Sequence, residues 1–575
     1  MAVLGLSFGY HDSAAVVVDD EGRVVAAAQE EQFSRKKHDR GFPRLAIDHV
    51  CRVFGSRDFA TVAYYENVAL KFNRIVESAM LTANGLYLMD AMTMWLVEDK
   101  FDPARTIREA LGRAEVVEFS HHASHIASAF YCSPFERATI LTMDGVGEYE
   151  TLTVSIGEGS RIEKIAVLHL PLSLGLFYSA ITAYLGFEVN EGEYKVMGMA
   201  GFGEPRHLDA MRKLIWPTAD GFFALDERYF QFRSARDVPY TPALVELLGP
   251  ARVPDSPFRA GGEGDVRRHA DIAASAQRWI EELVCHVVLG AVRRTGVADV
   301  CLAGGVALNS LANHRLQTKM TGRLYVQPAA GDAGGAMGAA LLAHHITPGR
   351  RRAPPLRVPY LGDQFSEDEI ASILERHEVP HRRLADAAET VAEVAGLLAG
   401  GAVVGWVQGR VEWGPRALGN RSILASPLDA RMQEVVNTKI KFREPFRPFA
   451  PAVIKERAAE FFELAAPLHE CGPEHYMLSV APVRPDKRAL IPAVTHVDGT
   501  ARLQAVDRDI NPMFHALIEE FGRLTGVPVL LNTSFNLKGE PIVRSPEDAL
   551  RTFAYSGMDA LVLGHHLIAK DGLYD

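Results

Sequence analysis

The sequence predicts an α/β protein of two domains, and three observations support this prediction. The chain has 575 residues, more than one hydrophobic core usually supports. A pattern of strand, polar loop and hairpin occurs twice in its first 170 residues. A Pro- and Arg-rich stretch at 346–359, "ITPGRRRAPPLRVP", is typical of an interdomain linker. We therefore expect domains at 1–345 and 360–575, joined by this linker.

The first copy of the repeat covers residues 2–30. The apolar run "AVLGLSF" precedes the loop "GYHDS" and the run "AAVVVDD", and "EG" then turns the chain into "RVVAAAQEE". The second copy, at 138–170, reads "ATILTMDG", "ETLTVSI", "GEGS" and "RIEKIAVLHL". Two unrelated hairpins are the alternative. A duplicated opening of this kind resembles the two lobes of the actin-like ATPase fold, also called ASKHA, in which loops after the first strands face a ligand cleft.

Two glycine-rich loops occur later in the same half. "CLAGGVALNS" at 301–310 predicts a strand, a Gly304-Gly305 turn and a helix start, and the glycines allow a ligand to approach the backbone closely. "VQPAAGDAGGAMGAA" at 326–340 predicts a strand, a loop with Asp332 and a helix of small residues. Neither loop has the P-loop pattern. Tight packing is the alternative explanation for each.

Composition narrows the class of protein. A net charge of −11 argues against a general nucleic-acid or anionic-membrane binder, so an anionic ligand needs a local cationic pocket. Five scattered cysteines without a CxxC pattern indicate reduced thiols. The first residues lack the basic region of a signal peptide, and no apolar run approaches the ~18 residues of a membrane span. These features predict a cytoplasmic protein.

Three histidines stand close together in "FSHHASHIASAF" at 119–130. Ser120 is a predicted N-cap, and the helix should end before Pro134. His121 and His125 are then i and i+4 on one face and could share a metal ion, although such a pair is more often structural. His122 points about 100° away around the helix, which suggests packing or an outer role.

Two carboxylates change the interpretation of this histidine pair. Asp144 and Asp332 come after strands that the repeat directs toward the predicted cleft. Two imidazoles with two carboxylates suit a divalent ion such as iron, manganese or magnesium, whereas structural zinc usually recruits thiolates. The chain has no HExxH pattern, which argues against a zincin protease.

The C-terminal half is rich in cations at two places, "GRVEWGPRALGNRSILASPLD" (409–429) and "NTKIKFREPFRPFAP" (437–451). Few acidic residues accompany them, so they predict a pocket for phosphate or carboxylate, with a basic surface as the alternative. The seven cations are Arg410, Arg416, Arg421, Lys439, Lys441, Arg443 and Arg447.

Two further stretches are predicted parts of that pocket. "AVTHVDGTARLQAV" (493–506) predicts a hairpin around Asp498-Gly499 that offers His496 and Arg502. "VPVLLNTSFNLKGEPIV" (527–543) predicts a strand that ends in polar side chains able to hydrogen-bond a nucleotide or an amide, namely Asn532, Ser534 and Asn536.

Over essentially its whole length the chain resembles the NodU/CmcH-type O-carbamoyltransferases. The resemblance rests on nine motifs in order: "HHASHIASAFY", "MDGVGE", "GEYKVMGMA", "AGGVALN", "GDAGGA", "GPRALGNRSILA", "FRPFAP", "THVDGTAR" and "NTSFN". It implies a YrdC-like α/β C-terminal domain that makes carbamoyl adenylate from carbamoyl phosphate and ATP with Mg²⁺. It also implies an ASKHA-type N-terminal domain that transfers the carbamoyl group to a hydroxyl of a small molecule, such as a natural product.

The resemblance also implies roles for individual residues. The metal ligands fall on His121, His125, Asp144 and Asp332, with iron(II) preferred to manganese(II). Ligand contacts in the N-terminal domain fall on Lys37, Gly145, Gly175, Lys195, Gly305 and Asn309. Contacts to carbamoyl phosphate and nucleotide fall on Arg416, Lys441, Arg447, Arg502, Asn532 and Ser534. His11 and Asp144 are the expected catalytic residues, with His11 as the base.

Other functions remain open at this point. An ASKHA-type kinase would have no use for the basic C-terminal pocket, and a non-catalytic metal- and nucleotide-binding regulator would make no product. The expected partners are small molecules, without nucleic acid or membrane, and a homodimer is left open. Acceptor specificity is expected in residues 60–115 and 205–265. These segments lie outside the nine motifs and match no pattern of the family.

Overall fold

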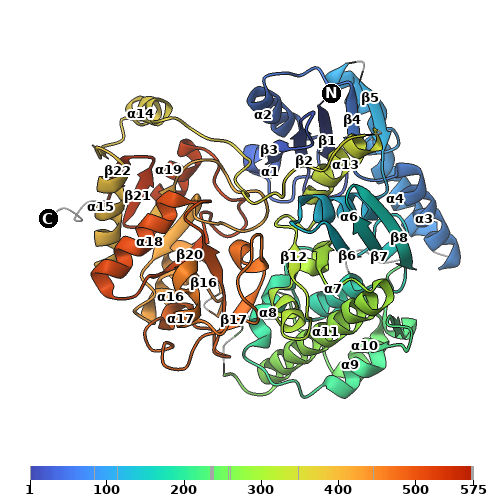
Figure 1. The fold of residues 1–575 in the computed structure, drawn as a ribbon. Helices are drawn as coiled ribbons and strands as arrows, with labels where there is room; N and C mark the ends of the chain where they lie inside the picture. The colour runs from blue at the N-terminus through green and yellow to red at the C-terminus, as the bar shows by residue number, and fades with distance from the viewer. Residues whose placement is uncertain are drawn as a thin grey trace. The chain divides into compact units, whose positions relative to one another are not determined.

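The computed structural model describes residues 2–570 except 83–84, 113, 234–237, 255, 257, 259–260, 348 and 445. The chain divides into two compact units (Figure 1). Unit 1 comprises Met1–Glu30 and Arg40–Leu356, and unit 2 comprises Glu31–Asp39 and Arg357–Asp575. Among the described residues, no helix combines the length and the apolar character needed to cross a bilayer.

Unit 1 contains two five-stranded sheets with one topology. The first has the order β3 (Val24–Gln29), β2 (Ala14–Val18), β1 (Val3–Ser7), β4 (Thr61–Tyr64), β5 (Glu115–Glu118). The second has the order β8 (Arg161–His169), β7 (Glu150–Glu158), β6 (Arg137–Met143), β11 (Val300–Ala303), β12 (Leu324–Val326). In each sheet the first three strands of the copy are antiparallel and the next two run parallel to the first strand. The predicted duplication, and with it the actin-like α/β class, is confirmed.

Helices and one small ribbon surround these sheets. The helices are α2 (Arg44–Phe54), α3 (Val68–Leu81), α4 (Gly85–Val97), α5 (Pro103–Leu111), α6 (His121–Cys132), α7 (Leu174–Tyr184), α8 (Glu193–Ala200), α9 (Leu208–Leu214), α10 (Pro242–Leu248), α11 (Asp265–Thr295), α12 (Ser310–Gln317) and α13 (Asp332–Ile346). The short 3₁₀ turns are η1 (Glu227–Tyr229) and η2 (Gly305–Leu308), and β9 (Ile215–Pro217) pairs with β10 (Phe223–Leu225).

The small residues of α13 allow this helix to lie very close to its neighbours. A Cβ on Gly338 would lie 1.7 Å from the backbone oxygen of Ser124 in α6, and one on Gly5 of β1 would lie 2.0 Å from that of Ala336. Glycine is therefore required at both crossings. This packing brings the first turns of α6 and α13, which carry His121 and Asp332, to the same place.

Unit 2 is built on one mixed sheet of eight strands. Its order is β13 (Arg382–Arg383), β22 (His566–Ala569), β21 (Ala560–Leu563), β14 (Val404–Val407), β15 (Arg421–Ala425), β20 (Val529–Ser534), β16 (Ala450–Ile454), β19 (Gln504–Val506). A separate ribbon joins β17 (Val480–Pro482) to β18 (Thr500–Arg502). Apolar side chains fill both faces of the large sheet, as in the core groups around Ile423 and Trp406. This is the α/β architecture that the YrdC-like prediction requires.

The helices of unit 2 are short apart from three. They are α1 (Glu31–Ser34), α14 (Glu367–Arg376), α15 (Ala387–Ala399), α16 (Arg431–Val435), α17 (Ala458–Phe461), α18 (Pro512–Thr525) and α19 (Pro546–Ala554). Single turns are η4 (Lys455–Arg457), η5 (Pro473–Tyr476) and η6 (Pro492–Val494), and η3 (Val436–Ile440) is a π-helical turn.

Residues 31–39 belong to unit 2 although the chain on both sides belongs to unit 1. The guanidinium of Arg35 donates to the carbonyl oxygens of Ile542 at 2.7 Å and Pro541 at 2.9 Å, and it lies 3.6 Å from the Asp548 carboxylate. The guanidinium of Arg544 lies 4.7 Å from the ring centroid of Phe33. The predicted domain limits did not include this exchange.

One local prediction is wrong. Residues 493–506 do not form a hairpin on themselves, because β18 pairs with β17, some twenty residues earlier in the chain. Only a tight turn remains, in which His496 accepts from Gly499 and donates to Thr500 through the backbone. Part of the predicted linker also packs within unit 1, where Arg352 donates to backbone oxygens at the end of α6 and Leu356 donates to Cys132.

Candidate functional site

The first candidate site is formed by α6, α13 and the loop after β6. Ser120 caps α6 by accepting a hydrogen bond from the Ala123 amide, so the helix starts where the sequence predicted. His121 and His125 therefore lie one turn apart on the same face. Asp144 comes directly after β6, and Asp332 is the first residue of α13. All but Asp144 are almost fully buried.

The four side chains converge. Nε2 of His121 lies 2.9 Å from Asp144 Oδ2, and Nε2 of His125 lies 3.3 Å from the same oxygen. The two Nε2 atoms are 3.1 Å apart. Asp332 Oδ1 lies 3.6 Å from the first ring and 3.8 Å from the second. One ligand atom from each residue lies within 4.8 Å of the others.

This donor set fits a divalent metal ion. Two ring nitrogens that face each other at 3.1 Å cannot both carry a proton without repulsion, whereas a cation satisfies both together with the carboxylates. Burial lowers the pKa of His121, but the Asp332 carboxylate and the hydrogen bond to Asp144 raise it to about 9 overall. The pKa of Asp144 lies well below its usual value: burial opposes this shift, but the hydrogen bonds with His121 and His125 outweigh it. The cluster is thus an ion pair before any metal arrives.

His122 does not join the cluster. Its Nδ1 lies 2.6 Å from the hydroxyl of Thr142, and burial holds its pKa well below the usual value. A neutral, buried imidazole of this kind packs the base of the site.

His11 lies at the rim of the same cluster. Its Nδ1 is 2.9 Å from Asp12 and its Nε2 is 3.6 Å from Asp332. Burial lowers the pKa of His11, but the Asp332 charge and the hydrogen bond to Asp12 raise it well above 6.5. The protonated ring is therefore favoured in the absence of a metal.

Backbone groups hold the Asp144 loop. The amides of Gly145 and Gly305 donate to Asp144 Oδ1 at 2.8 and 3.1 Å. Ser173 donates to the carbonyl oxygens of residues 144 and 145 at 3.1 and 2.7 Å. A Cβ on Gly175 would lie 2.6 Å from the Asp144 oxygen, so the start of α7 needs glycine there. Three predicted glycine positions thus border Asp144.

Glu148 is a residue of this site that the sequence did not single out, although it ends the motif "MDGVGE". Its buried carboxylate accepts hydrogen bonds from the His121 amide at 2.9 Å and the Asn67 amide at 2.7 Å. A carboxylate at the first turn of α6 also complements the helix dipole. Glu148 therefore fixes the backbone of His121, one of the two clustered histidines.

Two other predicted N-terminal positions have different surroundings. Asn309 caps α12 by accepting from the Ala312 amide, and it exchanges hydrogen bonds with Gln277. The ammonium of Lys195 on α8 lies 5.9 Å from the ring centroid of Phe187. Within the described part of the chain, neither residue forms a hydrogen bond or ion pair with His121, His125, Asp144 or Asp332.

The second candidate site is a group of cations in unit 2. The irregular backbone at η3 brings Lys441 to the end of β20: a π-helical turn leads into Phe442 with φ +49°. The buried ammonium donates to the Ser534 carbonyl at 2.5 Å, the Ser534 hydroxyl at 3.0 Å and Asn536 Oδ1 at 2.6 Å. The lysine is thereby fixed among neutral acceptors.

Mutual repulsion characterises this cationic cluster, which comprises Arg416, Lys441, Arg443, Arg447 and Arg502. Burial, and then the charges of the other three arginines, lower the pKa of Arg502 well below its usual value. Burial, then Arg443, Arg447 and Lys37, do the same for Lys441. Lys37, which was predicted as a ligand contact of the N-terminal domain, lies in unit 2, and its charge acts on Lys441 of the cationic cluster. A bound anion would relieve this repulsion, which is the reason to regard the cluster as an anion site.

Neutral polar groups complete the cluster. Asn532 donates to Gln504 Oε1 at 2.7 Å and to the Ala417 carbonyl at 3.2 Å. In the described part of the chain, Nε of Arg502 and Oδ1 of Asn532 are buried without a hydrogen-bond partner. Unsatisfied buried polar atoms at a cationic cluster indicate a place for a polar ligand.

Two of the seven predicted cations serve the fold. Arg421 is buried and donates to the backbone oxygens of Gln408 at 2.7 Å and Arg544 at 3.1 Å. Arg410 donates to the carbonyls of Leu361 and Gly362 at 2.6 and 3.1 Å. Their guanidinium groups therefore bind loop carbonyls.

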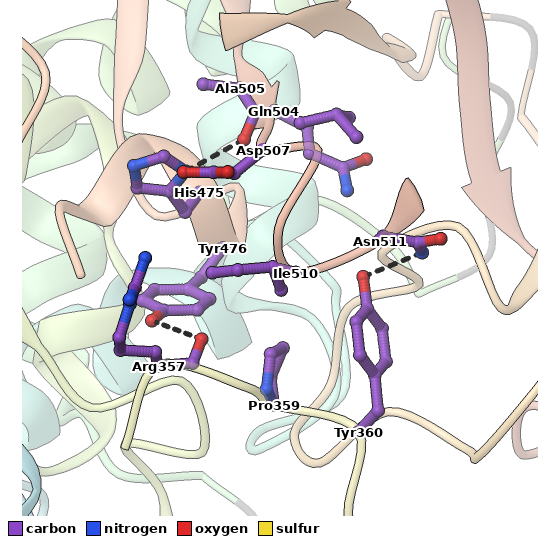
Figure 2. Close-up of a pocket in the computed structure, with 11 residues that line it drawn as sticks. Arg357, Pro359, Tyr360, His475, Tyr476, Gln504, Ala505, Asp507, Ile510 and Asn511 are labelled. Atoms are coloured by element: carbon purple, nitrogen blue, oxygen red, sulfur yellow. Dashed lines mark hydrogen bonds between the residues drawn. The ribbon is translucent and has the colours of Figure 1, made fainter. Parts of the chain in front are cut away.

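A small pocket lies beside β19 in unit 2 (Figure 2). Figure 2 shows Tyr360 and Asn511 on one side, joined by a 3.0 Å hydrogen bond, and His475 and Tyr476 on the other. Gln504 also lines the pocket, and its amide nitrogen donates to the Leu418 carbonyl at 2.8 Å. Gln504 therefore links the pocket wall to Asn532 of the cationic cluster, although no cluster arginine lines the pocket.

Family models match both parts of the chain. The model described as carbamoyltransferase N-terminus matches residues 2–341, and the one described as carbamoyltransferase C-terminus matches residues 395–570. The chain belongs to the carbamoyltransferase family.

Relatives of this carbamoyltransferase extend over most of its length. It is 41% identical to the protein named uncharacterized protein sll1178 of Synechocystis sp., covering 99% of this chain and 96% of the relative. It is 38% identical to nodulation protein NolNO of Sinorhizobium fredii, covering 97% and 79%. Nodulation protein U of Rhizobium tropici is 28% identical over 92% and 90%. A solved structure of HypF from T. kodakarensis covers 60% of this chain and 48% of that one, at 16% identity and a TM-score of 0.33.

The carbamoyltransferase thus brings most of the predicted residues into two groups. His11, His121, His125, Asp144, Gly145, Gly175, Gly305 and Asp332 gather in unit 1. Lys37, Arg416, Lys441, Arg447, Arg502, Asn532 and Ser534 gather in unit 2. Their roles in binding and catalysis stay predictions.

Proposed function

We propose that this carbamoyltransferase is an ATP-dependent O-carbamoyltransferase with one half-reaction in each unit. Unit 2 forms carbamoyl adenylate from carbamoyl phosphate and ATP with release of pyrophosphate. Unit 1 then transfers the carbamoyl group to a hydroxyl of a small molecule. The observation that carries the proposal is the separation of chemistry: an imidazole–carboxylate cluster lies in unit 1 and a cationic cluster in unit 2.

The cationic cluster suits the proposed adenylation. Carbamoyl phosphate and ATP are both anionic, and Arg447 and Arg502 can neutralise them with charge-assisted hydrogen bonds. Lys441 is held by Ser534 and Asn536, so it meets the ligand in a fixed position. Mg²⁺ is expected to accompany ATP.

The unit 1 cluster suits the proposed transfer. His121, His125, Asp144 and Asp332 hold a divalent ion, with iron(II) preferred to manganese(II) from the mixture of imidazole and carboxylate donors. When bound, such an ion supplies Lewis-acid polarisation of a carbonyl oxygen. His11 is the proposed acceptor of the hydroxyl proton; its raised pKa works against that role while Asp332 carries its full charge.

The acceptor is proposed to be a hydroxylated small molecule, such as a natural product in the cytoplasm. Its recognition is assigned to residues 60–115 and 205–265, which contain none of the residues gathered in the two clusters. The two domains are proposed to divide at 346–359, with residues 31–39 exchanged into unit 2.

The test measures pyrophosphate and carbamoylated product in parallel for two variants. His125→Ala should still release pyrophosphate from ATP and carbamoyl phosphate but transfer nothing to a panel of hydroxylated acceptors. Arg447→Ala should make little adenylate yet still carbamoylate the acceptor when carbamoyl adenylate is supplied. Equal loss of both signals in a folded His125→Ala protein would contradict the division and favour one composite site.

A further inference from the structure

The helix α4 of unit 1 is apolar on every side but buries little of itself. Its sequence, "GLYLMDAMTMWLV", contains one charged residue, and only Ala91 and Trp95 are buried. Figure 1 shows α3 and α4 at the outer edge of their unit. Helices that are apolar all round are normally enclosed by other structure. This helix therefore presents a surface that a partner should cover.

The exposed apolar side chains form one group at the end of α3 and along α4. Each exposes between 41% and 80% of its surface, and the members of this apolar face are Met80, Leu81, Leu86, Met89, Met92, Leu96 and Val97. Contiguous exposed apolar surface of this kind marks interaction sites on soluble proteins.

The spacing along α4 indicates a helical partner. Leu86, Met89, Thr93 and Leu96 succeed one another at intervals of three, four and three residues, all exposed, which is the spacing of a coiled-coil seam. The series reads the same in both directions. An antiparallel copy of α4 would therefore place Leu86 opposite Leu96 and Met89 opposite Thr93, as a two-fold interface requires.

The charge and shape of this apolar face argue against a membrane surface or a small ligand as its partner. Among the described residues of α3 and α4, the exposed charged ones are Glu77 and Asp90, both acidic. Helices that lie on membranes carry Lys and Arg on their polar face instead. A single helix face is also convex, whereas small ligands bind in concave sites.

We propose that the apolar face of α3 and α4 is the interface between two copies of this chain, related by a two-fold axis across antiparallel α4 helices. Seven large apolar side chains, each at least 41% exposed, supply area on the order of the ~800 Å² per partner found in stable interfaces. The interface does not depend on the carbamoyl chemistry proposed above.

The test measures the monomer–dimer equilibrium of the full chain by sedimentation velocity over a range of concentrations. Met89→Glu and Leu96→Glu should each raise the dissociation constant about 30-fold or more, because each would bury a charge in the seam. Leu524→Glu, at a leucine of α18 that is 45% exposed, is the matched control and should leave it unchanged. Circular dichroism checks the fold of each variant.

A disulfide test fixes the direction of the helices. The natural cysteines Cys51, Cys132, Cys285, Cys301 and Cys471 are buried, so introduced thiols react alone. The double variant Leu86→Cys/Leu96→Cys should cross-link into covalent dimers on mild oxidation, while each single variant should not. A monomeric wild type, a dimer that survives both glutamate substitutions, or binding of monomers to lipid vesicles through Leu96 would each overturn the proposal.

Discussion

The two clusters differ in what holds them together. In unit 1, imidazoles and carboxylates attract one another, and the pKa values of His121 and Asp144 shift apart as an ion pair requires. In unit 2, cations repel one another, and the pKa values of Lys441 and Arg502 fall. The charges of the first cluster offset one another without a ligand, but a histidine proton must leave before a metal can bind. The second cluster is held together by the surrounding fold, and a bound anion would relieve the repulsion between its cations.

The largest expected effect is the loss of the metal. Asp332→Ala or His121→Ala removes a ligand, so the affinity should fall by more than the roughly 10–100-fold that removal of an outer partner costs. Elemental analysis of protein loaded with iron(II) measures this, with His169→Ala on the exposed part of β8 as control. If both variants keep one metal per chain, the unit 1 cluster is not the metal site.

The next effect concerns the repelling cluster. Arg502→Ala removes one charge-assisted contact worth about 1.5–3 kcal/mol, or roughly 10- to 150-fold in use of carbamoyl phosphate. Arg502→Lys should recover part of this lost activity, because lysine restores the positive charge but not the planar guanidinium that can form two parallel hydrogen bonds.

Arg431→Ala is the matched control, since Arg431 is exposed and paired with Asp429. Equal kinetics for the wild type and Arg502→Ala, measured as pyrophosphate release, would show that Arg502 only supports the fold.

Metal binding should depend on pH in the direction that His121 sets. A histidine must be neutral to bind a metal, so the metal has to displace a proton wherever the pH lies below the His121 pKa of about 9. The affinity should therefore rise about tenfold per pH unit from pH 6 to 8 and level off above about 9.

The folding stability of the metal-free protein should change with pH in the opposite direction, falling as the pH rises. Because the pKa of His121 is raised on folding, the stabilisation is complete below pH 6.5 and is lost as pH rises through about 9.

The proton released on metal binding can be counted directly. Calorimetric titration of the protein with metal, repeated in buffers of different ionisation heat, measures it. Binding without proton release at pH 7 would contradict the ion-pair description.

The smallest effect should come from the support of the cluster. Glu148→Gln weakens the hydrogen bonds to the His121 and Asn67 amides and should lower metal affinity about tenfold, at the low end for an outer partner. Glu150→Gln, two residues on and paired with Lys164 at the surface, is the control. An unchanged affinity in Glu148→Gln would mean that the cap of Ser120 alone positions α6.

Features that depend on neighbouring residues were predictable from the sequence. The Ser120 cap, the i,i+4 histidines and the repeated hairpins are of this kind, and all are present. Arg421 could not be separated from Arg447, because composition does not tell whether a cation meets buried carbonyls or another cation. Likewise β18 pairs with a strand some twenty residues earlier in the chain, and a local turn signal carries no information on that pairing.

Residues 31–39 have a consequence for biosynthesis. They leave the ribosome long before their partners are made, because Arg35 contacts Pro541, Ile542 and Asp548. At about 5–20 residues per second, these partners appear on the order of a minute later. Residues 357–575 alone therefore cannot form the whole of unit 2. A fragment that starts at Arg357 would lack both the Arg35 contacts and the Lys37 charge.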